Sequence, residues 1–256
     1  MNVFADYSKF YDLLYYDKDY QKEASYILDL ITKNKPNTKT ILELGCGTGI
    51  HASIIAKSKI SVTGIDQSAE MIKSAYKRAS KLPAVTQNKL DFQIGDIRYF
   101  NLDKTFDTCL ALFHIISYLT SNKDVSATLQ NVKKHLKRDG LFIFDCWYGP
   151  AVLNIKPAIK EKVVENKQIK VVRVASPETH PNECVVDVNY HLIAINKENN
   201  ECAEIQEQHK MRYFFKPELE QLLLISGFKL IHTEEWLTKK TPGADTWGVT
   251  FIARAT

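Results

Sequence analysis

The chain has 256 residues, a formal net charge of +4 and 45% hydrophobic residues. This composition is that of an ordinary globular protein, long enough to bury a core without disulfide or metal staples. It excludes a disordered chain, a collagen-like repeat and a disulfide-rich scaffold. The net charge is also too small for a nucleic-acid-binding protein, which needs a concentrated basic face.

The cysteines and the apolar stretches indicate a cellular compartment. The five cysteines form no CxxC pair and the sequence has no HExxH motif, so we expect no metal site of local spacing. Scattered thiols are typical of a reducing compartment. The first residues lack the basic start and apolar core of a signal peptide, and the longest largely apolar stretch, 109–119, is too short to cross a bilayer. We therefore expect a cytoplasmic protein with no membrane partner.

Strand and helix signals alternate along the first 146 residues. Large residues spaced by three and four, such as Tyr11, Leu14 and Tyr15, predict one or two helices over 4–33. The segments that follow are a strand at 40–44, a helix at 51–57, a strand at 60–65, a helix at 68–81 with Ser68 as its N-cap, and strands at 90–94 and 106–112. A helix is expected over 124–136, with Gly140 just beyond it as the stop signal, and a strand follows at 141–146. This order predicts a parallel sheet with right-handed crossovers.

The pattern changes after Trp147. Period-two alternation with β-branched residues predicts antiparallel strands between 160 and 215, with a turn at Asn199-Asn200. A helix at 217–226 and strands at 229–235 and 247–253 complete the chain. The predicted fold is α/β: a doubly wound, Rossmann-like, seven-stranded sheet with an N-terminal helical lid (1–35) and an inserted antiparallel β subdomain (151–215). Residues 36–150 and 216–256 would form the ligand-binding domain.

A glycine-rich turn follows the first strand of this domain. Glu43 precedes Gly45, Gly47 and Gly49, and Asp66 ends the next strand 21 residues after Gly45. Glycines there let a ligand lie against bare backbone, and a carboxylate at the next strand end can accept both hydroxyls of a ribose. Asp96 ends the third strand at the same edge. Three acidic groups at three strand ends predict a nucleoside pocket.

The details of the turn distinguish between nucleoside ligands. A dinucleotide site needs GxGxxG, whereas Ile50 stands where the last glycine of that pattern would be. Glu43 suits an ammonium better than a phosphate. These features disfavour an NAD-dependent oxidoreductase and indicate a cationic ligand that carries adenosine and an amino acid.

This set of residues resembles the class I S-adenosylmethionine-dependent methyltransferases over residues 40–146. Further stretches at 11–20, 112–119 and 211–213 resemble small-molecule members of that class, especially sugar N,N-dimethyltransferases. The resemblance implies S-adenosylmethionine as cofactor. The cofactor-binding residues that it implies are Tyr20, Glu43, Gly45, Gly47, Gly49, Asp66, Gln67, Met71, Asp96, Ile97 and Leu112.

Methyl transfer is an in-line displacement, so the protein chiefly supplies alignment and a dry pocket. His114 is the candidate general base and Tyr11 the second candidate catalytic residue; a structural histidine at a strand-to-helix turn is the alternative for His114. Candidate substrate-binding residues are Tyr15, Tyr118, Trp147 and Tyr148. Some sugar N-methyltransferases have a histidine where Tyr118 aligns, so one acceptor contact is expected to differ.

The predicted activity is methyl transfer to a small molecule, such as the amine of a nucleotide-linked amino sugar. The alternatives are an O-methyltransferase of another small metabolite and a non-catalytic subunit that binds S-adenosylmethionine. A nucleic-acid methyltransferase is disfavoured because the sequence has no Asn/Asp-Pro-Pro-aromatic tetrad and no Pro-Cys nucleophile. The inserted strands are expected either to pair two copies as a homodimer or to cover the acceptor.

Overall fold

The computed structural model describes residues 10–256, so the first part of the helices predicted over 4–33, residues 4–9, lies outside the described part of the chain. Its central sheet pairs strands in the order β3-β2-β1-β4-β5-β11-β10. Their bounds are β1 (Thr40–Leu44), β2 (Ser61–Asp66), β3 (Leu90–Ile94), β4 (Phe106–Ala111), β5 (Leu136–Tyr148), β10 (Phe228–Glu235) and β11 (Gly248–Ala255). The four pairs of neighbours from β3 to β5 are parallel, whereas β11 runs antiparallel to both β5 and β10. The parallel strands all end at one edge, which is where the predicted site lies.

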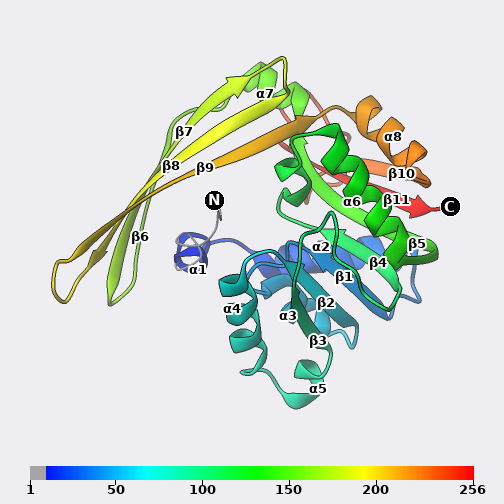
Figure 1. Ribbon diagram of the computed structural model, residues 1–256, viewed down its shortest axis with the longest axis horizontal. Coiled ribbons are helices and arrows are strands. Elements are labelled where there is room, and N and C mark those ends of the chain that lie inside the picture. The colour runs from blue at the N-terminus through cyan, green and yellow to red at the C-terminus, as the bar shows by residue number, and fades with distance from the viewer. Residues whose placement is uncertain (1–9) are drawn as a thin grey trace.

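Helices cover both faces of this sheet (Figure 1). On one face α2 (Tyr20–Asn34), α3 (Ile50–Ala56) and α4 (Ala69–Ala79) bury Ile27, Ile55 and Ile72 in one apolar cluster. On the other face α6 (Asn122–His135) and α8 (Lys216–Ile225) bury Leu129 and Leu223 in a second cluster. Burial of large apolar side chains on both faces is the main stabilising contribution to such a sheet. The α/β doubly wound, Rossmann-like prediction is confirmed.

The local predictions differ from the structure mainly at one helix end. The helix predicted to stop at Gly140 ends at His135, and β5 begins at once with Leu136 paired to Phe106 of β4. Gly140 therefore lies inside a strand, after Asp139 with φ 57°, where the pairing register shifts. The helix end thus lies within one residue of the predicted bound of 136, but strand pairing with β4, and not Gly140, ends the helix. The N-cap prediction holds, because the Ser68 side chain accepts a hydrogen bond from the Met71 amide.

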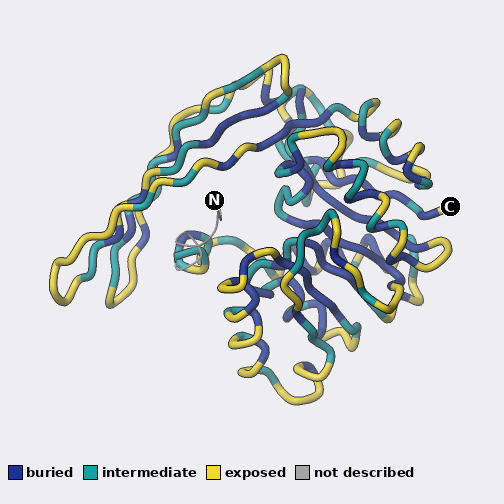
Figure 2. The backbone as a smooth tube through the Cα atoms, viewed as in Figure 1, coloured by how far each residue is buried: buried dark blue, intermediate teal, exposed yellow. Residues whose placement is uncertain are grey.

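The insert is a long antiparallel arm. It consists of β6 (Lys160–Glu165), β7 (Ile169–His180), β8 (Val185–Asn196) and β9 (Cys202–Phe214), paired in sequence order. The antiparallel prediction for 160–215 is confirmed. The arm joins the central sheet where Tyr213 and Phe214 pair with Trp147 and Tyr148. Figure 2 shows buried residues throughout the central sheet and mostly exposed ones at the far end of the arm.

A short N-terminal helix, α1 (Tyr11–Leu14), lies between the arm and the central sheet (Figure 1). Leu14 is fully buried against Val164, Val171 and Leu192 of the arm. On its other side, Asp12 accepts a hydrogen bond from Thr48 in the glycine-rich turn and forms an ion pair with Arg78 of α4. This helix thus connects the arm to the edge of the sheet. The division of the chain at residues 35, 150 and 215 stays a prediction.

Three short helices complete the described chain. They are α5 (Ala84–Gln87), the 3-10 helix η2 (Ile115–Tyr118) and α7 (Gly149–Ile155), none of which the sequence pattern predicted. Across residues 10–256, no helix is long and apolar enough to cross a membrane. No group of three or more His, Cys, Asp and Glu side chains that could hold a metal ion occurs in the same residues.

Candidate active site

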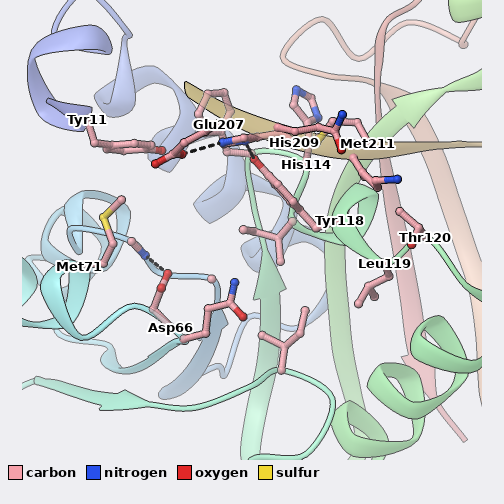
Figure 3. Close-up of a pocket in the computed structure, with 18 of the residues that line it drawn as sticks. Tyr11, Asp66, Met71, His114, Tyr118, Leu119, Thr120, Glu207, His209 and Met211 are labelled. Atoms are coloured by element: carbon pink, nitrogen blue, oxygen red, sulfur yellow. Dashed lines mark hydrogen bonds and ion pairs between the residues drawn. The ribbon is translucent and has the colours of Figure 1, made fainter. Parts of the chain in front are cut away.

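A cavity of about 960 Å³ opens at the carboxyl edge of the parallel strands. Its floor includes the glycine-rich turn after β1, and its far wall is β9 of the arm (Figure 3). A smaller cavity of about 40 Å³ adjoins it beside Tyr20, Thr48 and Leu112. The predicted residues that line the large cavity are Tyr11, Tyr15, Gly45, Gly47, Asp66, Gln67, Met71, Asp96, Ile97, His114, Tyr118 and Trp147. The structure therefore brings together most of the residues that were predicted for cofactor and acceptor.

The glycines of the turn have different roles. Gly47 has a φ of 52°, and a Cβ built there would meet no atom within 4 Å, so its backbone is bare toward the cavity. Gly49 has a φ of 71°, but it lines neither cavity, and a Cβ there would come within 2.9 Å of the Phe92 ring. Gly49 is thus required for close packing at the start of α3, and Gly47 is the position at which a ligand could lie against the backbone.

Asp66 ends β2 beside this turn. Its carboxylate accepts hydrogen bonds from the Gly47 and Ser68 amides, each at 2.9 Å, and the residue is only 9% exposed. Burial raises the pKa of Asp66, while these two amides oppose the rise. The carboxylate lines the cavity and is held in one orientation, as a ribose-binding group should be.

Glu43 belongs to a buried polar cluster behind the turn that includes His51 and Glu23. Its Oε1 lies 3.8 Å from His51 Nδ1, and His51 Nε2 lies 2.8 Å from a carboxylate oxygen of Glu23. Lys18 forms an ion pair with Glu23, and its ammonium stands 4.3 Å from the ring centroids of both Tyr20 and Phe113. Glu43 is 2% exposed and does not line either cavity.

One oxygen of Glu43, Oε2, has no hydrogen-bond partner among the described residues. Burial raises the pKa of this carboxyl to about 8. A buried polar group without a partner costs free energy of folding. This oxygen therefore needs a hydrogen-bond donor or a cation. The ammonium of an amino-acid ligand, reached directly or through a water, would meet that need.

The opposite end of the cavity carries the residues predicted for adenine. Gln67, Met71 and Ile97 line it as expected. Asp96 also lines it, but its carboxylate is bound by the Arg98 guanidinium at 2.6 Å, and Arg98 also pairs with Asp124. The hydrogen bonds from Arg98 hold the pKa of Asp96 below its ordinary value. Arg98 is thus a residue of this site that the sequence analysis missed.

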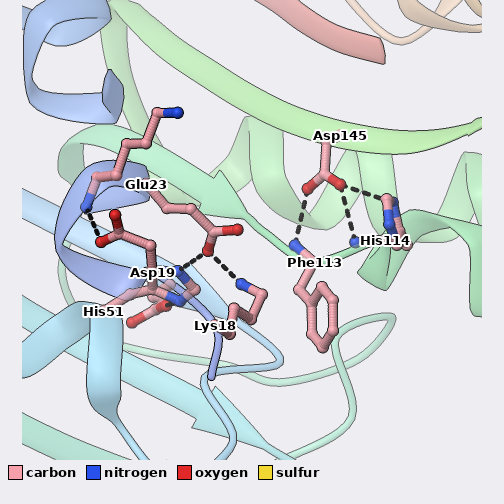
Figure 4. Close-up of polar contacts among 9 residues, drawn as sticks. Lys18, Asp19, Glu23, His51, Phe113, His114 and Asp145 are labelled. Carbon is pink, nitrogen blue, oxygen red and sulfur yellow. Dashed lines mark hydrogen bonds and ion pairs between the residues drawn. The ribbon is translucent and has the colours of Figure 1, made fainter. Parts of the chain in front are cut away.

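His114 lies beside the buried carboxylate of Asp145 where β4 and β5 end. His114 Nδ1 lies 2.7 Å from Asp145 Oδ2, and the same carboxylate accepts the Phe113 and His114 amides at 2.7 and 3.1 Å (Figure 4). Phe113 and His114 have φ values of 66° and 64°, an uncommon conformation for non-glycine residues. Asp145 stabilises this strained turn, and it holds the His114 ring at the wall of the cavity.

The predicted aromatic residues separate into two groups. The rings of Tyr11 and Tyr15, at the two ends of α1, pack against each other at a tilt of 52°, with centroids 4.8 Å apart, and line the cavity together with Trp147. Tyr148 does not line it but packs against the core on the α6 side. Neighbouring residues of β5 point to opposite faces of the sheet, which directs the Tyr148 side chain away from the face on which Trp147 lines the cavity. The substrate-binding prediction for Tyr148 therefore lacks structural support.

Residues 204–211 of β9 line the cavity, and the sequence analysis missed all of them. Among the residues that the structure describes, β9 pairs with β8 along most of its length and with β5 only at Tyr213 and Phe214, so its other edge faces the cavity. Within this strand His209 lies 2.9 Å from the Tyr118 hydroxyl and 3.2 Å from Glu207. The alternation in the sequence predicted a strand here, but it carried no signal that this strand would cross to the glycine-rich edge.

The chain is similar to known methyltransferases. Residues 41–140 match a family model described as a methyltransferase domain. The chain is 26% identical over 232 residues to the dTDP-3-amino-3,4,6-trideoxy-alpha-D-glucopyranose N,N-dimethyltransferase of Streptomyces venezuelae, covering 90% of this chain and 93% of that protein. It is 27% identical to the dTDP-3-amino-3,6-dideoxy-alpha-D-glucopyranose N,N-dimethyltransferase of Streptomyces fradiae, with coverages of 88% and 86%.

Solved structures share the whole fold. The crystal structure of Streptomyces venezuelae DesVI has a TM-score of 0.79 to this chain, with 23% identity and coverages of 98% of this chain and 99% of that one. A crystal structure of an S-adenosylmethionine-dependent methyltransferase from Clostridium acetobutylicum also has a TM-score of 0.79, with 18% identity and 98% coverage of both chains. The likeness therefore extends over the sheet and the inserted arm alike.

Proposed function

We propose that this chain, a class I S-adenosylmethionine-dependent methyltransferase that acts on a small molecule, methylates the amine of a nucleotide-linked amino sugar. The enzyme class is the premise, and the acceptor is the proposal. The acceptor is supported by the two Streptomyces relatives, which are dimethyltransferases of dTDP-linked amino sugars. The observation that carries it is the extent of the large cavity, which continues from the cofactor residues to a polar wall on β9.

The residues at the sheet edge fit the cofactor. At Gly47 the backbone is exposed to the cavity, and Asp66 offers an oriented carboxylate for a ribose. Glu43 has a buried oxygen without a hydrogen-bond partner among the described residues. We assign the adenine end to Gln67, Met71 and Ile97 and the methionine end to the smaller cavity beside Tyr20 and Leu112. When bound, S-adenosylmethionine supplies an electrophilic methyl group on a positively charged sulfur.

The acceptor end suits a sugar better than a simple amine. Its wall on β9 presents Glu204, Gln206 and Gln208 beside the free edge of the strand, and these groups can bind several hydroxyls. Aromatic side chains of Tyr11, Tyr15 and Trp147 line the same space and can pack on the apolar face of a sugar ring. A cavity of about 960 Å³ lies at the upper end of the range for small-molecule sites, as two ligands bound together require.

His114 is the proposed general base. A carboxylate 2.7 Å from Nδ1 favours a proton on that nitrogen, which leaves the Nε2 lone pair to take a proton from the acceptor. Tyr11, on α1, would help to orient the acceptor and to exclude water. This arrangement explains why α1 is fixed to both the arm and the glycine-rich turn through Leu14 and Asp12.

The test is a methyl-transfer assay with methyl-deuterated S-adenosylmethionine and defined acceptors. We expect label on a nucleotide-linked amino sugar and none on the matched neutral nucleotide sugar. Label on a hydroxyl of the neutral sugar would contradict the amine acceptor and favour an O-methyltransferase. Cofactor binding without S-adenosylhomocysteine in any mixture would contradict the proposal in favour of a non-catalytic subunit.

The proposal includes a homodimer and a cytoplasmic location. The arm exposes Val163 and Ile193, which are 57% and 37% accessible, so pairing of two arms would cover apolar surface. The five cysteines are all free, as expected in a reducing compartment. Light scattering of the purified protein tests the first point, since a monomeric mass at micromolar concentration contradicts it.

A further inference from the structure

Three side chains in the wall of the large cavity form a chain of hydrogen bonds (Figure 3). The Tyr118 hydroxyl, at the end of η2, lies 2.9 Å from His209 Nδ1, and His209 Nε2 lies 3.2 Å from Glu207 Oε2. All three residues line the cavity. They come from segments 91 residues apart in the sequence, which only the docking of β9 beside η2 brings together.

The order of these groups fixes the direction of every hydrogen bond in the chain. A carboxylate can only accept, so the proton of a neutral His209 is placed on Nε2, toward Glu207. Nδ1 then carries a lone pair and accepts from the Tyr118 hydroxyl. Once the phenol proton is directed to His209, the Tyr118 oxygen can only accept from any further group.

The surroundings preserve this arrangement. The His209 side chain is 4% exposed and the Glu207 side chain 10%, so water competes little for their hydrogen bonds. The Tyr190 ring packs edge-on against the His209 ring, with centroids 4.8 Å apart, and limits rotation of the imidazole. Burial raises the pKa of Tyr118 well above its ordinary value, so the phenol keeps the proton that it donates.

We propose that His209 and Glu207 hold the Tyr118 oxygen as an obligate hydrogen-bond acceptor that binds an N–H of the acceptor amine and so aims the nitrogen lone pair. This inference rests on the proposed function, because it names an amine. A neutral amine attacks through its one lone pair, and its N–H bonds must point away from the attacking direction. Tyr118 is the residue that touches the substrate, and His209 and Glu207 are positioning residues.

The Tyr118 chain complements His114 and does not duplicate it. Both end in a buried carboxylate, Asp145 for His114 and Glu207 for His209, and both present an acceptor atom to the same cavity. An amine has more than one N–H to place. His114 is proposed to remove a proton, whereas the phenol of Tyr118, with its raised pKa, orients the nitrogen and takes no proton.

The first test needs no substrate. Long-range ¹H–¹⁵N spectra of protein labelled on its seven histidines would report the tautomer of each ring, and the His209→Asn spectrum would identify the His209 signals. We expect a proton on Nε2 and an unprotonated, hydrogen-bonded Nδ1. A proton on Nδ1 overturns the inference, because it would turn the Tyr118 hydroxyl away from His209.

The second test is kinetic. Tyr118→Phe should lower kcat/KM for the amino-sugar acceptor by about tenfold, through both KM and kcat, with unchanged cofactor affinity. His209→Leu should have the same effect, and His209→Asn, whose carbonyl can accept from Tyr118, should stay within about threefold of wild type. His232→Asn is the matched control, because His232 pairs with Glu234 two residues away on β10 but lies outside the cavity.

The outcomes separate this inference from the proposed function. An active enzyme whose kcat/KM is unchanged by Tyr118→Phe overturns the inference alone. If His209→Leu does not fold, Tyr118→Phe and His209→Asn still decide whether the inference holds. A wild-type enzyme that methylates no amine overturns both proposals.

Discussion

The Asp66 carboxylate accepts a hydrogen bond from the Gly47 amide at 2.9 Å and so ties the end of β2 to the glycine-rich turn after β1. The same carboxylate lines the large cavity. One side chain therefore both shapes the turn and faces the ligand. The link explains why the two strand ends act as one site, although 19 residues separate them in the sequence.

Asp66→Ala should weaken S-adenosylmethionine binding at least tenfold. Hydrogen bonds from a ribose to a charged carboxylate contribute about 1.5–3 kcal/mol each, and the turn also loses its anchor at Gly47. Isothermal titration calorimetry measures the effect. Asp103→Asn, which alters an exposed carboxylate outside both cavities, is the control. Unchanged affinity in Asp66→Ala would contradict the placement of the ribose.

Glu43→Gln should stabilise the unliganded protein in a pH-dependent way. The folded protein holds Glu43 with a pKa of about 8, against an ordinary value of 4.5, because burial disfavours the charged form. Between these two values the unfolded chain ionises Glu43 and the folded protein does not, so stability falls as pH rises. The substitution removes that loss. Its benefit should be small near pH 5 and complete above about pH 8.

Thermal unfolding at pH 5 and pH 8.5 measures this difference. We expect the Tm of Glu43→Gln to exceed that of wild type by about 2–4 °C for each kcal/mol of unfolding free energy that the substitution restores. The difference in Tm should be larger at pH 8.5 than at pH 5. Glu161→Gln on the exposed β6 strand should show no such trend. The same variant should bind the cofactor more weakly, because glutamine cannot pair with its ammonium. A gain of equal size at both pH values would show that burial does not set the ionisation of Glu43.

The elements that the sequence predicted well are those with strong local signals. The strand at 40–44 has the predicted bounds, and Ser68 caps α4 as expected, because buried strands and N-caps are encoded within a few residues. Gly140 was wrong as a helix stop, since pairing of Leu136 with Phe106 depends on a strand 30 residues away. His209 and Glu207 could not be placed at all. Their position depends on how the arm docks beside η2, and no local pattern specifies that.

The same distinction holds within the site. Asp66 and the glycines were predictable because one segment of chain carries the turn and the next strand end follows at a fixed distance. Trp147 and Tyr148 were predicted as a pair, yet only Trp147 reaches the cavity. The prediction placed both residues at the correct edge of the sheet, but it did not say which face of β5 each side chain would be on. The pleat of the strand determines that face. Arg98 was missed because its role depends on side-chain reach to Asp96 and Asp124.

His114→Asn should reduce turnover at least tenfold and leave cofactor affinity within about threefold. General bases contribute about 10²- to 10⁴-fold to a rate, whereas a ring that serves only packing would affect folding more than turnover. Stopped-flow measurement of a single methyl transfer, with a separate cofactor titration, distinguishes these roles. His232→Asn is again the control histidine. A wild-type rate in His114→Asn would return His114 to a structural role at the strained turn.

Leu14→Ala should detach α1 from the arm without unfolding the central sheet. Leu14 is fully buried, and truncating such a side chain costs about 2–5 kcal/mol when its surroundings cannot collapse. Since α1 has only four residues, that loss should appear as local opening. Hydrogen exchange should increase in residues 10–18 and in β6, while β1 and β4 keep their protection. Because α1 carries Tyr11, KM for the acceptor should rise severalfold with little change in cofactor affinity. Leu153→Ala, at a side chain that is 45% exposed on α7, is the matched control, and an equal exchange pattern in both variants would show that Leu14 does not hold the helix on the arm.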